Sequence, residues 1–180
     1  EWNIQKFTNN RFKNIKLNDN AKPIFSDKIY SVTNKSFENP KISEGKTLLI
    51  FENNLSFEVT DFKDDKFKEI LLVSNNTDRI IKLSEKVSKF KANLLENQKT
   101  RLKEESIDCK IININDLKNI TEEVYALYPT VGENLNFIQS NKLKNIKFLY
   151  RKLDQFSWQY CNKGFFNFKN YIPKIIAKFI

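Results

Sequence analysis

The stretch that decides the fold is TLLIF, residues 47–51, which is a continuous apolar run of strand length. Four further runs of this kind follow it, at residues 69–73, 108–114, 123–128 and 146–150. Apolar residues fill both faces of each run instead of alternating with polar ones. This pattern is typical of strands covered on both sides, as in a parallel sheet. The sequence therefore predicts five strands in a mostly parallel sheet.

The segments between these runs have helical character. The clearest is expected from Ser84, a predicted N-cap, to about Glu105, with Glu85 in the first turn. A short helix is expected at 115–120 and another at 135–142. Two more are expected at 153–160 and 168–179, with Gly164 ending the first of them. Strands that alternate with helices predict an α/β fold with a doubly wound, Rossmann-like sheet.

Residues 1–46 differ from the rest of the chain. They are rich in Asn, Lys and Asp and show little periodicity, although short helices are possible within 1–12 and 27–36. We interpret them as an N-terminal extension, and residues 47–180 as the α/β domain. The sequence has no Met, so we expect the chain to be a processed product or a piece of a longer protein.

Composition excludes several kinds of chemistry. The 180 residues include no His, so a Ser-His-Asp triad, a Cys-His dyad and a His-ligated metal site are all excluded. The two cysteines, Cys109 and Cys161, have no metal-binding spacing, and Cys109 falls in a predicted strand as a buried thiol. We predict no metal and no catalytic residue. With no segment long enough to cross a bilayer and no leader pattern, the default expectation is a cytoplasmic protein without membrane partners.

The loops after the predicted strands are the first candidate site, because open α/β sheets bind ligands at the carboxyl ends of their strands. No Gly-rich phosphate motif is present. Ordinary strand-to-helix turns are the alternative interpretation. The predicted ligand-binding residues are Asn53, Ser74, Asn75, Thr130 and Gly132.

The cationic C-terminal region is the second candidate site. Residues 141–180 contain nine Lys or Arg and one Asp, a net charge of +8 out of +9 for the whole chain. Ten aromatic residues fall within 148–179, and aromatic rings beside cations suit single-stranded nucleic acid. A helix that packs its apolar face on a sheet would show the same pattern, and AT-rich codons alone would raise the Lys content. The predicted nucleic-acid-binding residues are Arg151, Lys152, Trp158, Lys163 and Lys169.

Three stretches of the sequence resemble photolyase/cryptochrome-related flavoproteins of a variant in which a FAD-binding helical domain precedes the α/β domain. They are NIQKFTNNRF at 3–12, TLLIFE at 47–52 followed by Asn54-Leu55, and the stretch from Trp158 to Pro173 with its KGFFNFK motif. The resemblance implies a photolyase-like α/β domain, with residues 1–46 including the tail of the FAD-binding domain. The residues that bind FAD would lie upstream of Glu1, so none is carried over. The sequence ENNL at 52–55 replaces the usual Arg-rich loop, which argues against an antenna chromophore.

Three functions follow as hypotheses. The first is a non-catalytic accessory domain of a photolyase- or cryptochrome-like flavoprotein, in DNA repair or light sensing, with FAD in the parent protein. Its partners would be DNA and a FAD-binding helical domain in cis or in trans, and the parent would be a deoxyribodipyrimidine photolyase-like lyase. The second is a stand-alone basic module that binds nucleic acid. The third is an α/β domain that binds a small molecule at the strand ends.

Overall fold

The computed structural model describes residues 6–9, 11–12, 20, 37–57, 60–76 and 82–179. The chain divides into two compact units, Glu1–Lys35 and Ser36–Ile180. In the first unit, Lys6 and Phe7 are helical. Of the other residues in the possible helix at 1–12, the structure describes only 8, 9, 11 and 12. The possible helix at 27–36 lies outside the described residues. Everything below concerns the second unit.

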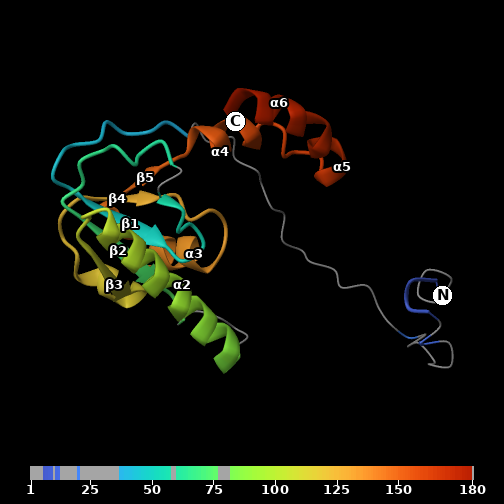
Figure 1. Cartoon of the computed structure of the whole chain (residues 1–180), viewed down its shortest axis with the longest axis horizontal. Helices are drawn as coiled ribbons and strands as arrows, with labels where there is room; N and C mark the ends of the chain where they lie inside the picture. Colours follow the sequence, from blue (N-terminus) through green and yellow to red (C-terminus); the bar gives the residue numbers. More distant parts are fainter. Residues whose placement is uncertain are drawn as a thin grey trace. The chain divides into compact units, whose positions relative to one another are not determined.

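A five-stranded, all-parallel sheet forms the centre of this unit (Figure 1). Its strands match the five apolar runs, so the prediction of a doubly wound α/β fold is confirmed. Their bounds are β1 Thr47–Phe51, β2 Glu69–Ser74, β3 Cys109–Asn113, β4 Val124–Leu127 and β5 Ile146–Leu149.

The strand order β3-β2-β1-β4-β5 positions the site. From β1 the chain adds β2 and β3 on one side, and it then returns to add β4 and β5 on the other side. In such a sheet the loops after β1 and β4 lead to opposite faces and leave a crevice at their carboxyl ends. The switch point of this sheet is therefore between β1 and β4.

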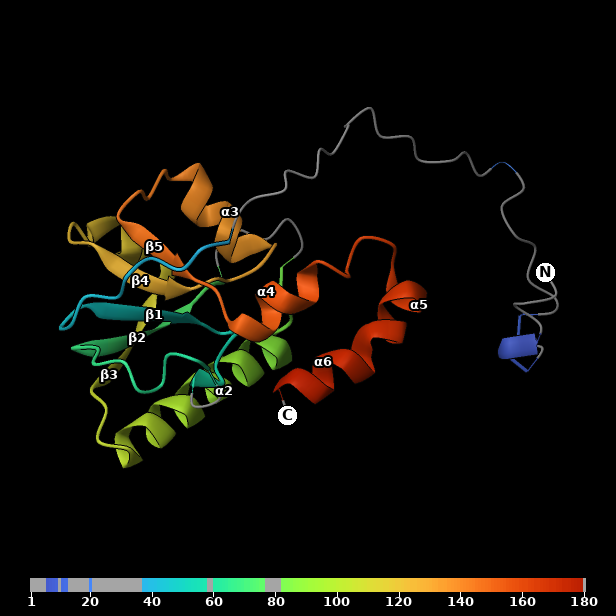
Figure 2. The same ribbon diagram turned by 90° about the horizontal axis from the view of Figure 1, so that it is seen from above.

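Both faces of the sheet are covered (Figure 2). Along β1, Leu48 and Ile50 belong to the core on the α2 face, while Leu49 and Phe51 belong to the core on the α3 face, and all four are fully buried. This period of two explains why the run is apolar throughout. The segment before β1 also packs on the sheet, because Ser43 N donates to the Tyr125 hydroxyl at 3.1 Å.

Helix α2, Glu85–Glu104, has the predicted start. Ser84 accepts a hydrogen bond from Val87 N at 3.4 Å, and Glu85 lies in the first turn. Its buried side carries Leu95, Gln98 and Leu102, which pack towards β2 and β3. Helix α2 also carries a second apolar stripe, formed by Val87, Phe90 and Leu94, and this stripe is exposed.

The other helices depart from the predictions at their ends. The short helix after β3 is a 3-10 helix, η2 Ile114–Asn119. It is capped by Asn113, two residues before the expected cap, because Asn113 and Asp116 form a capping box. Helix α3, Glu133–Ser140, begins directly after Gly132. Within the described residues, no helix is both long and apolar enough to cross a membrane.

The C-terminal helices form what we call the C-terminal lobe, residues 152–179. It contains α4 Lys152–Trp158, α5 Phe165–Phe168, η3 Lys169–Tyr171 and α6 Ile172–Phe179. The prediction that Gly164 ends a helix is wrong. Gly164 has φ +76° and stands at the N-cap of α5, since only glycine adopts this conformation at low cost. Helix α4 ends earlier, at Trp158.

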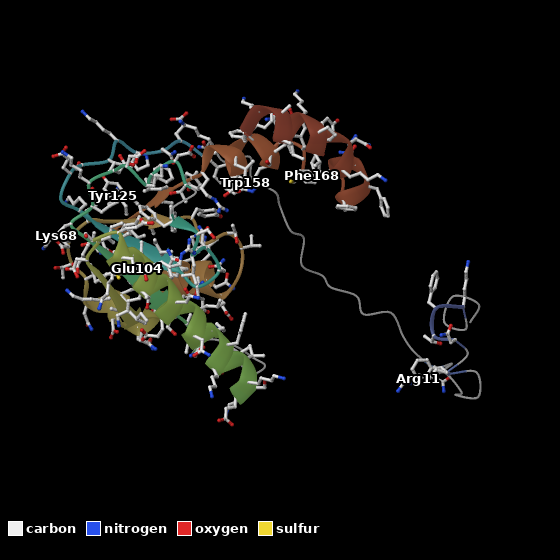
Figure 3. The ribbon with its side chains drawn as sticks, in the orientation of Figure 1. Arg11, Lys68, Glu104, Tyr125, Trp158 and Phe168 are labelled. Carbon is white, nitrogen blue, oxygen red and sulfur yellow. The ribbon has the colours of Figure 1, made fainter. Side chains whose placement is uncertain are left out.

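The lobe is held together by aromatic rings. Tyr160 and Tyr171 stack with their centroids 4.3 Å apart, and Phe156 packs on Phe179 at 5.5 Å. Trp158, which is labelled in Figure 3, joins the lobe to the sheet. The centroid of its ring lies 5.8 Å from that of Tyr128 and 4.7 Å from that of Phe37. The aromatic content of this segment therefore serves mainly to pack the helices.

Candidate functional site

A chain of three asparagine side chains crosses the switch point. Nδ2 of Asn75, after β2, donates to Oδ1 of Asn134 in α3 at 2.9 Å. Nδ2 of Asn134 donates to Oδ1 of Asn53, after β1, at 3.3 Å. Asn53 in turn donates to the Pro129 carbonyl at 2.8 Å. These bonds fix the loops after β1, β2 and β4 relative to one another, and they orient each amide.

An ion cluster lies beside the asparagine chain. Lys91 reaches from α2 to pair with Glu52, and its Nζ lies 3.7 Å from Oε1 of Glu133. The Lys91 ammonium also donates to the Asn75 carbonyl at 2.9 Å. The Glu52 side chain is only 5% exposed, so its charge depends on this partner. The cluster brings together two carboxylates and one ammonium.

The loop between β4 and α3 forms the outer wall of the site. Thr130 has φ +60° and Gly132 has φ +135° with ψ −164°, a conformation that is almost restricted to glycine. The first turn of α3 has no side-chain cap.

These parts surround a cavity of about 330 Å³, at the lower end of the range for small-molecule sites. Its walls combine carboxylates, amides and two apolar side chains. They are Glu52, Asn53, Pro129, Val131, Gly132, Glu133 and Asn134.

The structure brings part of the predicted ligand-binding set together. Asn53 and Gly132 line the cavity. Asn75 is fully buried behind them and reaches the site through Asn134. Ser74, which ends β2, and Thr130 are not among the lining residues.

Four polar residues of the site, and the apolar Pro129 and Val131, were absent from that set. Glu52, Glu133 and Asn134 stand in or next to the loops that follow β1 and β4, so the rule about strand ends pointed to their positions. Lys91 lies on the inner side of α2, far along the chain. Its role depends on how the helix packs, which no local motif indicates.

The five residues predicted to bind nucleic acid occupy different environments. Arg151 pairs with Asp154 at 2.7 Å, and Trp158 belongs to the aromatic cluster at the sheet edge. Lys152 is exposed, and its backbone amide donates to Asp61 at 2.7 Å. Lys163 and Lys169 are exposed around α5. Lys169 lies beside an exposed aromatic ring, with its Nζ 5.7 Å from the Phe166 ring centroid.

Several titratable groups outside the site have pKa values that burial raises. Burial raises the pKa of the Cys109 thiol, which is buried as predicted, whereas Cys161 is exposed. Burial also raises the pKa values of Tyr128 and Tyr150 in the cluster around Trp158. Among the described residues, no group of three or more metal-ligating side chains could hold a metal ion.

Comparisons with protein-family models, with curated proteins and with solved structures found no match. The site therefore has to be interpreted from its own geometry.

Proposed function

We propose that this α/β domain binds a small, flat, polar molecule without phosphate groups in the cavity at the β1/β4 switch point. The observation that carries the proposal is the cavity itself, with Glu52, Glu133 and Asn134 in its wall. Polar groups that converge at a switch point, held by a network of hydrogen bonds, are typical of ligand sites in this class of sheet.

The charges indicate which ligands fit. Among the described residues, the lining of the cavity includes the carboxylates of Glu52 and Glu133 and no cationic side chain. A phosphate or pyrophosphate would add negative charge beside the carboxylates, and no Gly-rich turn is present to cradle it. FAD, with its pyrophosphate, does not fit this cavity. A neutral or cationic ligand with N–H donors is favoured.

The side-chain amides in the cavity wall further limit the class of ligand that fits. Asn53 is exposed, and beyond its bonds to Pro129 and Asn134 its amide keeps a second N–H and a second oxygen lone pair, which complement the edge of a nucleobase or a similar heterocycle. Pro129 and Val131 provide apolar contacts for the face of such a ring. A nucleoside is therefore the probe of choice.

The test measures binding of the four common ribonucleosides and their 5′-monophosphates by ligand-detected NMR. We expect at least one nucleoside to bind, with no gain in affinity from its phosphate. Val131, which is 87% exposed at the rim of the cavity, provides a blocking variant, Val131→Trp. Val87→Trp on α2 is the matched control, because Val87 is also exposed but lies outside the cavity lining.

Two results would contradict the proposal. In one, no nucleoside binds; in the other, the monophosphate binds more tightly than its nucleoside. A bound nucleoside should also raise the free energy of unfolding, by about 2.7 kcal/mol at a concentration of one hundred times Kd. Val131→Trp should lose this stabilisation.

The flavoprotein context is a separate proposal, supported by the motifs at 3–12, 47–55 and 158–173. In that context the domain would act as an accessory to a FAD-binding partner. Flavin absorbance of the parent protein tests this, and a colourless parent would count against it. Neither result bears on whether the switch-point cavity binds a nucleoside.

A further inference from the structure

The C-terminal lobe carries an excess of positive charge, since its one carboxylate, Asp154, pairs with Arg151. From residue 155 to the end of the chain there is no Asp or Glu, while Lys163, Lys169, Lys174 and Lys178 all lie in the lobe and are exposed. Unbalanced positive charge on so short a segment attracts polyanions.

Two aromatic rings at the start of α5 are not used for packing within the lobe. Phe165 is 66% exposed and Phe166 is 80% exposed, and their centroids lie 5.9 Å apart. Phe156, Tyr160 and Tyr171, in contrast, are partly buried against one another or against α6. Lys169 Nζ lies 5.7 Å from the Phe166 ring centroid, so a cation accompanies the exposed rings.

A small polar pocket of about 130 Å³ opens in the same lobe. Three amide side chains and Lys163 line it beside the stacked pair of Tyr160 and Tyr171. Amides of Asn and Gln provide both donors and acceptors, which is how proteins contact the edges of unstacked bases. The three amides belong to Gln159, Asn162 and Asn167.

We propose that the C-terminal lobe binds single-stranded nucleic acid. Bases stack on Phe165 and Phe166, the phosphates lie near Lys163 and Lys169, and the pocket receives the edge of one base. A duplex does not fit this surface, because its bases are stacked on one another and their faces are unavailable. The proposal is independent of the nucleoside site, which lies at the switch point of the sheet.

An anionic membrane is the rival occupant, because Phe and Lys side chains also bind lipid surfaces. The polar pocket favours nucleic acid, since paired amide donors and acceptors match the edge of a base, whereas membrane binding rests on buried apolar area and charge. The apolar face of α6 is also in use within the lobe, with Ile175 buried and Phe179 packed on Phe156.

The experiment uses the full chain and a fluorescent oligothymidylate of about 12 nucleotides, with binding followed by anisotropy. The Phe165→Ala/Phe166→Ala variant should bind at least about tenfold more weakly, because stacking is lost for two bases. In the Lys163→Gln/Lys169→Gln variant, the negative slope of log K against log salt should become shallower by about 1.4. Each of the two lost phosphate contacts accounts for about 0.7 of this change.

The matched control is Lys89→Gln/Phe90→Ala on α2. Phe90 is 61% exposed and Lys89 is also exposed, yet both lie outside the lobe. This variant should bind the oligonucleotide like the wild type, and so should Val131→Trp. Circular dichroism should show that all variants keep the fold.

Four results would overturn the proposal. The first is that the wild type does not bind the oligonucleotide at low salt, and the second is that it binds a duplex of the same length equally well. The third is that the Phe165→Ala/Phe166→Ala variant binds like the control. The fourth is that the wild type binds phosphatidylserine vesicles in preference to the oligonucleotide, which would assign the surface to a membrane.

Discussion

Asn75 and Asn134 are 59 positions apart in the sequence, and their side chains meet in a hydrogen bond of 2.9 Å between Nδ2 and Oδ1. Asn75 is fully buried and Asn134 is 5% exposed, so water contributes little to satisfying either amide. The bond ties the end of β2 to the first turn of α3 across the switch point. It therefore shapes the wall of the cavity and contributes to stability.

Replacing Asn134 with Ala should destabilise the protein by about 1–3 kcal/mol. The substitution removes the acceptor for Asn75 Nδ2 and leaves a buried polar group without that partner. Urea unfolding followed by circular dichroism measures the change. Asn136→Ala is the control on the same helix, because Asn136 is exposed, and it should change stability by no more than about 0.5 kcal/mol. Equal effects of the two substitutions would contradict the role of the bridge.

Removing the Lys91 ammonium should destabilise the fold more strongly. In Lys91→Met the Glu52 carboxylate, which is 5% exposed, loses its ionic partner, at a cost of about 3 kcal/mol. Adding Glu52→Gln to this variant should restore part of the loss, because the uncompensated charge is gone. A double-mutant cycle by chemical denaturation measures the coupling.

The control for the Lys91 cycle is the exposed pair Lys99–Glu96 on the same helix, where Lys99→Met should cost less than about 1 kcal/mol. The expectation fails if the loss of unfolding free energy in Lys91→Met/Glu52→Gln equals the sum of the losses in the two single variants.

The fold was predictable because its signal is local and repeated. Each apolar run, such as residues 47–51, indicates a buried strand by itself, and alternation with helices then defines the sheet class. Helix ends were less predictable. Gly164 stands between two helices, and a glycine in such a segment can follow the end of one helix or be the N-cap of the next, as it is here.

The candidate site was predictable only in part. Asn53 and Gly132 lie in the loops that follow β1 and β4, so strand-end reasoning found them. Lys91 contributes through the way α2 packs on the sheet, and the sequence of α2 contains lysines on every side. The stripe of Val87, Phe90 and Leu94 even suggests a different buried face, yet these residues are exposed.

The two thiols should differ sharply in reactivity. Cys161 is exposed in the turn after α4, while burial raises the pKa of Cys109 and disfavours its thiolate. At neutral pH, a disulfide reagent such as DTNB should modify one thiol in the native protein and the second only after unfolding. Cys161→Ser should abolish the fast phase. A fast phase that survives in Cys161→Ser would show that Cys109 is accessible.

Stability should fall at alkaline pH because of Tyr128 and Tyr150. Burial raises the pKa of both phenols above the value of about 10 that they have in the unfolded chain. A raised pKa means that the folded state holds these protons more tightly. The stabilisation is therefore complete below about pH 10 and is lost as the pH rises through the higher pKa of the folded state.

Urea midpoints measured at pH 9 and pH 11 test the role of the two phenols. The midpoint of the wild type should drop between these values, and the drop should be smaller in Tyr128→Phe/Tyr150→Phe. Lysine titration contributes equally to both proteins and cancels in the comparison. An identical drop in the two proteins would mean that these buried phenols do not control alkaline stability. The aromatic cluster with Trp158 would then hold the C-terminal lobe on the sheet without any link to pH.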